Sequence, residues 1–99
     1  MTQREDEAWR RLGSVLDPET GLSVVDLGLI LELRETEGAL HVRMTLTHES
    51  CPLGFFILGS VRDALAPLCP DALPAVEVSF HPPWTPDRIT PAGRAALRR

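Results

Sequence analysis

Cys51 is the residue of this 99-residue chain whose type and position best suit chemistry. It stands directly before Pro52, a residue that suits the first turn of a helix because its missing N–H costs nothing there. Unpaired backbone N–H groups and the helix dipole favour an anion at such a place, so a thiol gains reactive thiolate character. The alternative is that Cys51 is an inert packing residue, the usual role of a free cysteine.

Cys69, the second cysteine, follows the other end of the same predicted helix. A helix over 52–68 is about 25 Å long at 1.5 Å per residue. A disulfide needs Cα atoms within about 7 Å, so the two cysteines of one chain cannot form one. They are also too far apart to share a metal ion, and we expect Cys69 to be structural.

Acidic residues and a histidine are expected near Cys51. Asp17 and Glu19 follow the first predicted helix, Asp26 directly precedes the first predicted strand, and His48 stands three residues before the cysteine. A Cys–His–acid set would indicate a nucleophilic hydrolase. However, the loop is tight and the sequence shows no oxyanion-hole pattern. Turn-forming and solvated charges are the simpler interpretation.

Trp84 stands in a proline-rich segment, residues 81–87. It is a candidate for binding a partner protein, and it is also a candidate for covering the edge of a sheet. A domain of this size needs its few aromatic residues for the core, which favours the covering role.

Three helices are predicted to position these residues. Thr2 and Glu5 form a capping-box pattern that opens the first helix, and Asp17-Pro18 is expected to end it. The second helix is predicted over 52–68, and a short third helix starts at Thr90-Pro91. The apolar residues of the first helix recur at helical spacing: Ala8, Trp9, Leu12, Val15 and Leu16.

Alternating apolar residues predict three strands, at 27–34, 40–46 and 73–80. The first two should pair antiparallel around a turn at 35–38. The predicted order is therefore α-β-β-α-β-α, in a two-layer α+β sandwich whose small, mainly three-stranded sheet is covered by helices on one face. Residues 1–99 are expected to form one domain.

Charge and hydropathy restrict the partners and the location. The net charge of −4 argues against binding nucleic acid, because neutralising phosphates needs a basic surface. No apolar run approaches the roughly 20 residues that cross a bilayer, and the first residues lack the apolar stretch of a secretion signal. We therefore expect a cytoplasmic protein that binds neither membranes nor nucleic acids.

Four short motifs then occur in one order: Asp17-Pro18-Glu19, Val25-Asp26-Leu27-Gly28-Leu29, Met44-Thr45-Leu46-Thr47 leading to Cys51-Pro52-Leu53, and Pro83-Trp84-Thr85-Pro86-Asp87. In this order they closely resemble the SufT/PaaD-like family of iron–sulfur cluster assembly proteins. The resemblance runs from about Trp9 to Leu97. It implies a compact domain of the iron–sulfur assembly type, and an accessory or targeting role rather than a catalytic one.

The resemblance also implies a site. The family's cysteine falls on Cys51, its Asp-Pro-Glu on residues 17–19, the aspartate of its second motif on Asp26, and the threonine before its cysteine loop on Thr47. In the family these positions gather around one shallow pocket. The family usually has a small residue, often glycine, before its cysteine, whereas this chain has Ser50 there, preceded by His48 and Glu49.

Iron–sulfur clusters usually take four thiolates, and one Cys51 per chain cannot supply them. We therefore expect no tightly bound cofactor and at most a transient cluster. Such a cluster is shared across a homodimer, completed by an acidic residue or a small thiol, or held only during transfer. The expected partners are the assembly machinery, client apoproteins and a carrier ATPase on a separate chain, because this sequence contains no phosphate loop.

Three functions remain open from the sequence. In the first, an assembly accessory contacts iron, a cluster or a client thiol through Cys51. In the second, an interaction adaptor, for example a PaaD-like subunit, docks a partner through Trp84 and the first helix, and Cys51 only packs. In the third, a small thiol enzyme uses Cys51 with Glu19, Asp26 or His48 as its base.

Overall fold

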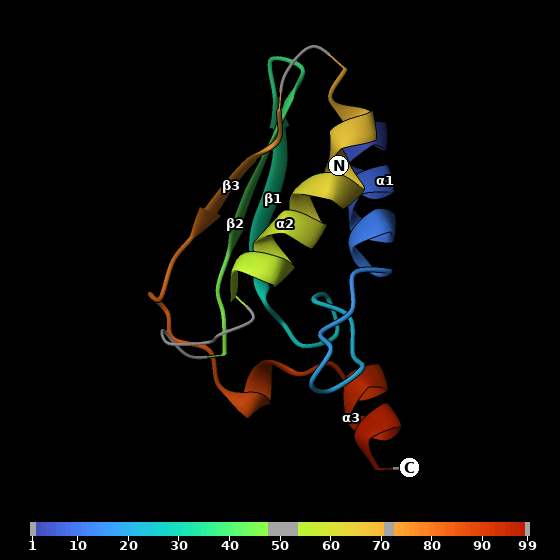
Figure 1. Ribbon diagram of the computed structural model, residues 1–99, viewed down its shortest axis with the longest axis vertical. Coiled ribbons are helices and arrows are strands. Elements are labelled where there is room, and N and C mark those ends of the chain that lie inside the picture. The colour runs from blue at the N-terminus through green and yellow to red at the C-terminus, as the bar shows by residue number, and fades with distance from the viewer. Residues whose placement is uncertain (1, 48–53, 71–72, 99) are drawn as a thin grey trace.

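The computed structural model describes residues 2–47, 54–70 and 73–98. In chain order, its elements are α1 (Gln3–Leu12), β1 (Ile30–Thr36), β2 (Ala39–Met44), α2 (Gly54–Leu65), the 3₁₀ turn η1 (Ala66–Leu68), β3 (Ala75–Val78), the 3₁₀ turn η2 (Pro86–Arg88) and α3 (Pro91–Leu97). α1 and α2 lie side by side against one face of the sheet, and α3 lies at the far end of the molecule (Figure 1). The predicted α+β order is confirmed.

The sheet has the order β1-β2-β3. β1 and β2 are antiparallel, as predicted, whereas β3 runs parallel to β2. Thr36 pairs with Ala39 across a two-residue turn in which Glu37 has φ 54° and Gly38 has φ 79°. Two positive φ angles are the mark of a type I′ turn, whose twist matches that of the strands it joins.

β1 begins at Ile30, three residues later than predicted. Leu27 and Leu29 are buried, as the alternation suggested, but they precede the strand in a tight turn. Gly28 has φ 75°, a left-handed conformation that interrupts extended backbone. A register shift between Ile30 and Glu32 breaks the alternation again and leaves Leu31 only half-buried.

α1 opens with the predicted capping box but ends at Leu12, well before Asp17-Pro18. Gly13 caps this end, and its N–H donates to the carbonyls of Trp9 and Arg10. Glycine is a poor helix former, so the helical spacing of the following apolar residues does not extend the helix. Leu16 is instead 54% exposed.

α2 and β3 are also shorter than predicted. The described helix ends at Leu65 and continues as the 3₁₀ turn η1, because Pro67 has no N–H for an α-helical bond. The predicted start at Pro52 lies outside the described residues. β3 spans only four residues, and Leu73 is 84% exposed rather than part of a strand.

One core joins the two layers. Its fully buried large side chains come from α1, from the turn before β1, from β2 and from α2. They are Leu12, Val24, Leu27, Leu29, Leu40, Met44, Val61 and Leu65. Among the described residues, no helix is long and apolar enough to cross a membrane.

Glu5 ties the first helix to the sheet. Its carboxylate accepts hydrogen bonds from the N–H of Thr2 at 2.8 Å and from the N–H of Glu35 at 2.7 Å. These two hydrogen bonds hold the pKa of Glu5 below its ordinary value of 4.5, and the bond from Thr2 contributes most. The folded protein therefore favours the ionised carboxylate.

Glu5→Gln should destabilise the protein at neutral pH and progressively less in acid. A lowered pKa in the folded state gives stability that is present above the unfolded value and lost as the pH falls through the folded one. Urea unfolding of both proteins from pH 7 to below 4.5 measures the difference. Asp6→Asn, an exposed change in the same helical turn, is the control. A difference in unfolding free energy that is constant over this range would contradict the assignment.

Candidate functional site

Cys51 lies in the segment 48–53, outside the described residues, and so do His48 and Ser50. The structure does place both flanks of this segment. Gly54, at the start of α2, is packed so closely that a Cβ added to it would lie 2.9 Å from Cδ1 of Leu46. The end of β2 and the start of α2 are thus in contact, and Thr47 beside them is half-buried. The role of Cys51 stays a prediction.

Asp17 organises its own loop. It is buried, and its carboxylate accepts hydrogen bonds from the N–H of Glu19 at 3.2 Å and the hydroxyl of Thr20 at 3.1 Å. This is the arrangement in which an aspartate closes a turn on the backbone just after it. Glu19 itself is exposed, so the Asp-Pro-Glu motif presents one free carboxylate to solvent.

Asp26 is bonded to the N-terminus of α3. Its Oδ1 accepts a hydrogen bond of 2.8 Å from the hydroxyl of Thr90, and its backbone carbonyl accepts another of 2.8 Å from the Thr90 N–H. Thr90 is also the N-cap of α3, because its Oγ1 accepts from the N–H of Gly93. Asp26 therefore fixes where the last helix begins.

The carbonyls of the two residues after Asp26, Leu27 and Gly28, also accept hydrogen bonds from the C-terminal part of the chain. Nε1 of Trp84 donates to the carbonyl of Leu27 at 2.6 Å, and Nε of Arg88 donates to the carbonyl of Gly28 at 2.8 Å. Trp84, Arg88 and Thr90 thus donate hydrogen bonds to three successive backbone carbonyls, those of residues 26–28. We call these three donors the C-terminal clamp. Two motifs of the family resemblance, far apart in sequence, form this one structural unit.

Sequence reasoning singled out Trp84 but missed Arg88 and the contact of Thr90 with Asp26. The Thr90-Pro91 pair did signal a helix start, although nothing local in the sequence shows which carbonyls the clamp bonds. The indole N–H of Trp84 is used within the chain, and its ring is half-buried against the core. A partner-binding role for Trp84 stays a prediction.

The loops that carry Asp17 and Asp26 are joined. Leu16 forms an isolated β-bridge with Ser23, whose hydroxyl accepts from the N–H of Asp26 at 3.0 Å. Both loops lie at the end of the molecule where β2 ends and α2 begins (Figure 1). The loops of Asp17 and Asp26 are thus connected by hydrogen bonds. Both carboxylates already accept hydrogen bonds from groups of the same chain.

The described residues contain no group of three His, Cys, Asp or Glu side chains placed to hold a metal ion. Asp17, Glu19 and Asp26 therefore do not form a three-ligand metal site with other described residues. Cys69 is buried beyond the opposite end of α2, as expected of a structural cysteine.

A family model described as iron–sulfur cluster assembly protein matches residues 5–79. The chain belongs to this family. The Fe-S protein maturation auxiliary factor YitW of Bacillus subtilis is 38% identical over 87 residues, which cover 87% of this chain and 85% of that relative. The Fe-S protein maturation auxiliary factor SufT of Staphylococcus aureus is 37% identical over 84 residues, or 84% and 96% of the two chains.

A solved structure supports the same conclusion about the fold. The crystal structure of a domain of unknown function from Bacillus anthracis superposes with a TM-score of 0.87 and 30% identity, over 96% of this chain and 92% of that one. The resemblance to the iron–sulfur cluster assembly family is confirmed by sequence and by structure.

Trp84→Phe should lower the unfolding free energy by about 1–3 kcal/mol, because it leaves the carbonyl of Leu27 without its donor. Chemical denaturation measures the loss. Trp9→Phe is the matched control, since Trp9 is also half-buried against the core and lies outside the clamp. Equal effects of the two substitutions would show that the indole N–H of Trp84 contributes nothing specific.

Gly28→Ala should be more destabilising than Gly21→Ala. Both glycines have φ 75°, so each substitution costs about 1–2 kcal/mol for a left-handed alanine. A Cβ at Gly28 would also lie 2.3 Å from the carbonyl oxygen of Arg88, whereas one at Gly21 meets nothing within 4 Å. That overlap adds about 1–3 kcal/mol. Paired urea titrations test this, and identical midpoints would disprove the close approach of the clamp.

Proposed function

We propose that this protein is an accessory factor in the maturation of iron–sulfur proteins. One observation carries the proposal: the chain covers 85% and 96% of two relatives that are named Fe-S protein maturation auxiliary factors. Because nearly the whole of each relative is matched, the likeness is not confined to a shared accessory domain. The proposed role is that of an auxiliary protein, with no turnover of its own, in the cytoplasm.

The proposed contact with iron, a cluster or a client thiol is made by Cys51. The chain has two cysteines, and the burial of Cys69, which is only 6% exposed, supports Cys51 as the thiol that makes the contact. The sequence places Cys51 between two flanks that touch each other through Leu46 and Gly54. Flanks that are fixed by packed elements support a proposed site between them, because functional groups need a rigid scaffold.

The scaffold around this end supports such a role. The C-terminal clamp bonds the carbonyls of residues 26–28, and Asp17 is bonded within its own turn. The carboxylates of Asp17 and Asp26 serve these bonds, so they are proposed to support the site rather than to ligate iron. Glu19 is the member of the predicted set whose carboxylate faces solvent and is available as an additional ligand.

The proposed cluster is transient. One thiolate per chain falls short of the usual four ligands, so the remaining ligands come from a partner, a small thiol or an acidic residue. This fits a protein that works with the assembly machinery, with a carrier ATPase on a separate chain and with client apoproteins. It does not fit a protein that stores a stable cluster.

Anaerobic reconstitution with iron and sulfide tests the thiol. The wild type should show a labile visible chromophore and bound iron, and Cys51→Ser should lose most of both. Cys69→Ser is the matched control, because it changes the buried thiol at the other end of α2 and should retain the iron. A stable stoichiometric cluster on the monomeric wild type would contradict transient binding.

Client maturation in cells tests the accessory role separately. Deleting the protein should lower the activity of iron–sulfur enzymes without lowering their amount, and Cys51→Ser should fail to restore it. Full restoration by Cys51→Ser would favour the adaptor function, in which α1 and Trp84 contact the partner. Unchanged enzyme activity after deletion would overturn the accessory role itself.

A further inference from the structure

The outward face of α2 carries an unusual set of residues. Phe55 is 90% exposed and Phe56 is 59% exposed, both in the first turn of the helix. One turn further on, Gly59 leaves open space, because an added Cβ would meet nothing within 4 Å. Large exposed aromatic side chains beside such a gap are characteristic of a surface that contacts another protein.

Four residues form a line along α2 and into the first residue of η1: Phe55, Gly59, Arg62 and Ala66. Their spacing of four, three and four is that of a seam between two packed helices. The side chains of α2 that enter the core, Ile57, Val61 and Leu65, lie on an adjoining side of the helix, so the seam runs along the flank of α2 rather than through the core. Within the part of the chain that the structure describes, Phe55 and Gly59 of the seam pack against no other element, and Arg62 and Ala66 border a hollow next to the sheet.

The seam of one copy complements the seam of a second copy that runs antiparallel to it. When two copies of α2 lie antiparallel about a two-fold axis between residues 60 and 61, Phe55 of one copy faces Ala66 of the other, and Gly59 faces Arg62. Each large side chain is then opposite a small one, the arrangement that lets two helices approach closely. We propose that α2 is the interface of a homodimer of this chain, built on this pairing.

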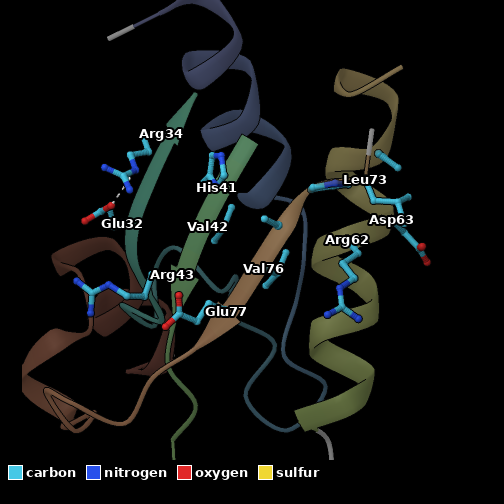
Figure 2. A pocket seen from close by; sticks show the side chains of 13 residues that line it. Glu32, Arg34, His41, Val42, Arg43, Arg62, Asp63, Leu73, Val76 and Glu77 are labelled. Atoms are coloured by element: carbon cyan, nitrogen blue, oxygen red, sulfur yellow. Dashed lines mark ion pairs between the residues drawn. The ribbon is translucent and has the colours of Figure 1, made fainter. Parts of the chain in front are cut away.

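A hollow beside the C-terminal half of α2 would receive the aromatic ring. It lies between α2 and the sheet, and Arg62, Asp63, Ala66, Leu73 and Val76 are among its lining residues (Figure 2). Leu73 is 84% exposed at this hollow. In the antiparallel pair, Phe55 from the second copy enters beside Ala66 and covers Leu73, so the two most exposed large apolar side chains among the described residues bury each other.

The charges on this face complement each other between copies. Arg62 and Asp63 are both exposed, and neither forms an ion pair with another described residue of its own chain. In the antiparallel pair, Arg62 of one copy lies about one helical turn from Asp63 of the other, within reach of its long side chain. The two-fold axis generates this ion pair twice.

The area indicates a weak dimer. A phenylalanine buries about 150–250 Å², so the exposed parts of Phe55 and Phe56 supply roughly 300 Å² per copy. With Leu73 and the polar seam residues added, the total approaches the lower end of about 1,200 Å² for specific interfaces. Dimerisation should therefore depend visibly on protein concentration.

This dimer is independent of the proposed function. In it, the two copies of Gly54 are roughly 20 Å apart along the helix axes, at 1.5 Å per residue. The flanks of the two Cys51 loops therefore lie at opposite ends of the interface. Reconstitution of iron tests the thiol, while the mass of the protein in solution tests the interface, so either can fail alone.

Sedimentation velocity over a wide range of protein concentration tests the dimer. The wild type should pass from monomer to dimer, and Phe55→Ala should shift this transition to higher concentration. Gly59→Leu should abolish the dimer, because the new side chain occupies the space that Arg62 of the second copy needs. The same change should raise the melting temperature of the monomer, since leucine is a better helix former than glycine, which separates lost assembly from misfolding.

A charge swap supplies the most specific test. Arg62→Asp should weaken the dimer by placing like charges together, and the double variant R62D/D63R should restore it. Leu16→Ala is the matched control, because Leu16 is another exposed apolar residue, 54% exposed and in a loop outside α2, and its removal should leave the dimer intact. A protein that stays monomeric at every concentration overturns the proposal, as does a dimer that survives both Gly59→Leu and Arg62→Asp.

Discussion

Three consecutive peptide carbonyls, those of residues 26–28, set the constraint on which the rest of the structure depends. They lie in the turn that leads into β1, where Leu27 is buried and the backbone does not form sheet bonds. Buried carbonyls need donors. Those donors are side chains and a backbone N–H from residues 84–90, so the end of the chain must fold back along the turn. The position of α3 follows from this requirement, and the close approach of Arg88 leaves no room for a side chain at residue 28.

Much of the fold could be predicted because its causes are local. The Thr2–Glu5 capping box, the turn at residues 37–38 and the apolar spacing of α2 all depend on neighbours a few positions apart. The predictions were wrong where one residue overrides a periodic pattern: Gly13 ends α1, and Gly28 delays β1. The parallel orientation of β3 and the clamp depend on contacts between distant residues, and such contacts leave no periodicity in the sequence.

In the candidate site, too, the sequence shows which residues are notable, but their contacts appear only in the structure. Residue types alone could mark Asp17 and Asp26 as candidates. They could not show whether each carboxylate binds a ligand or accepts hydrogen bonds from its own chain. The structure shows both carboxylates bonded to groups of the scaffold. A carboxylate can therefore matter to the fold without contacting a ligand. The proposed chemical role remains with Cys51.

The parallel pairing of β2 and β3 has a consequence for the place of the proposed site. Parallel neighbours require a crossover, and here α2 provides it, so β2, α2 and β3 form a single βαβ unit. In α/β proteins, ligands bind beyond the carboxyl ends of parallel strands, because there the chain turns from a strand into the N-terminus of a helix. Between β2 and α2 the sequence runs through residues 45–53, and Cys51 is one of them. The place of the proposed site in the chain is thus set by the topology, whereas its proposed chemistry depends on the side chains of that segment.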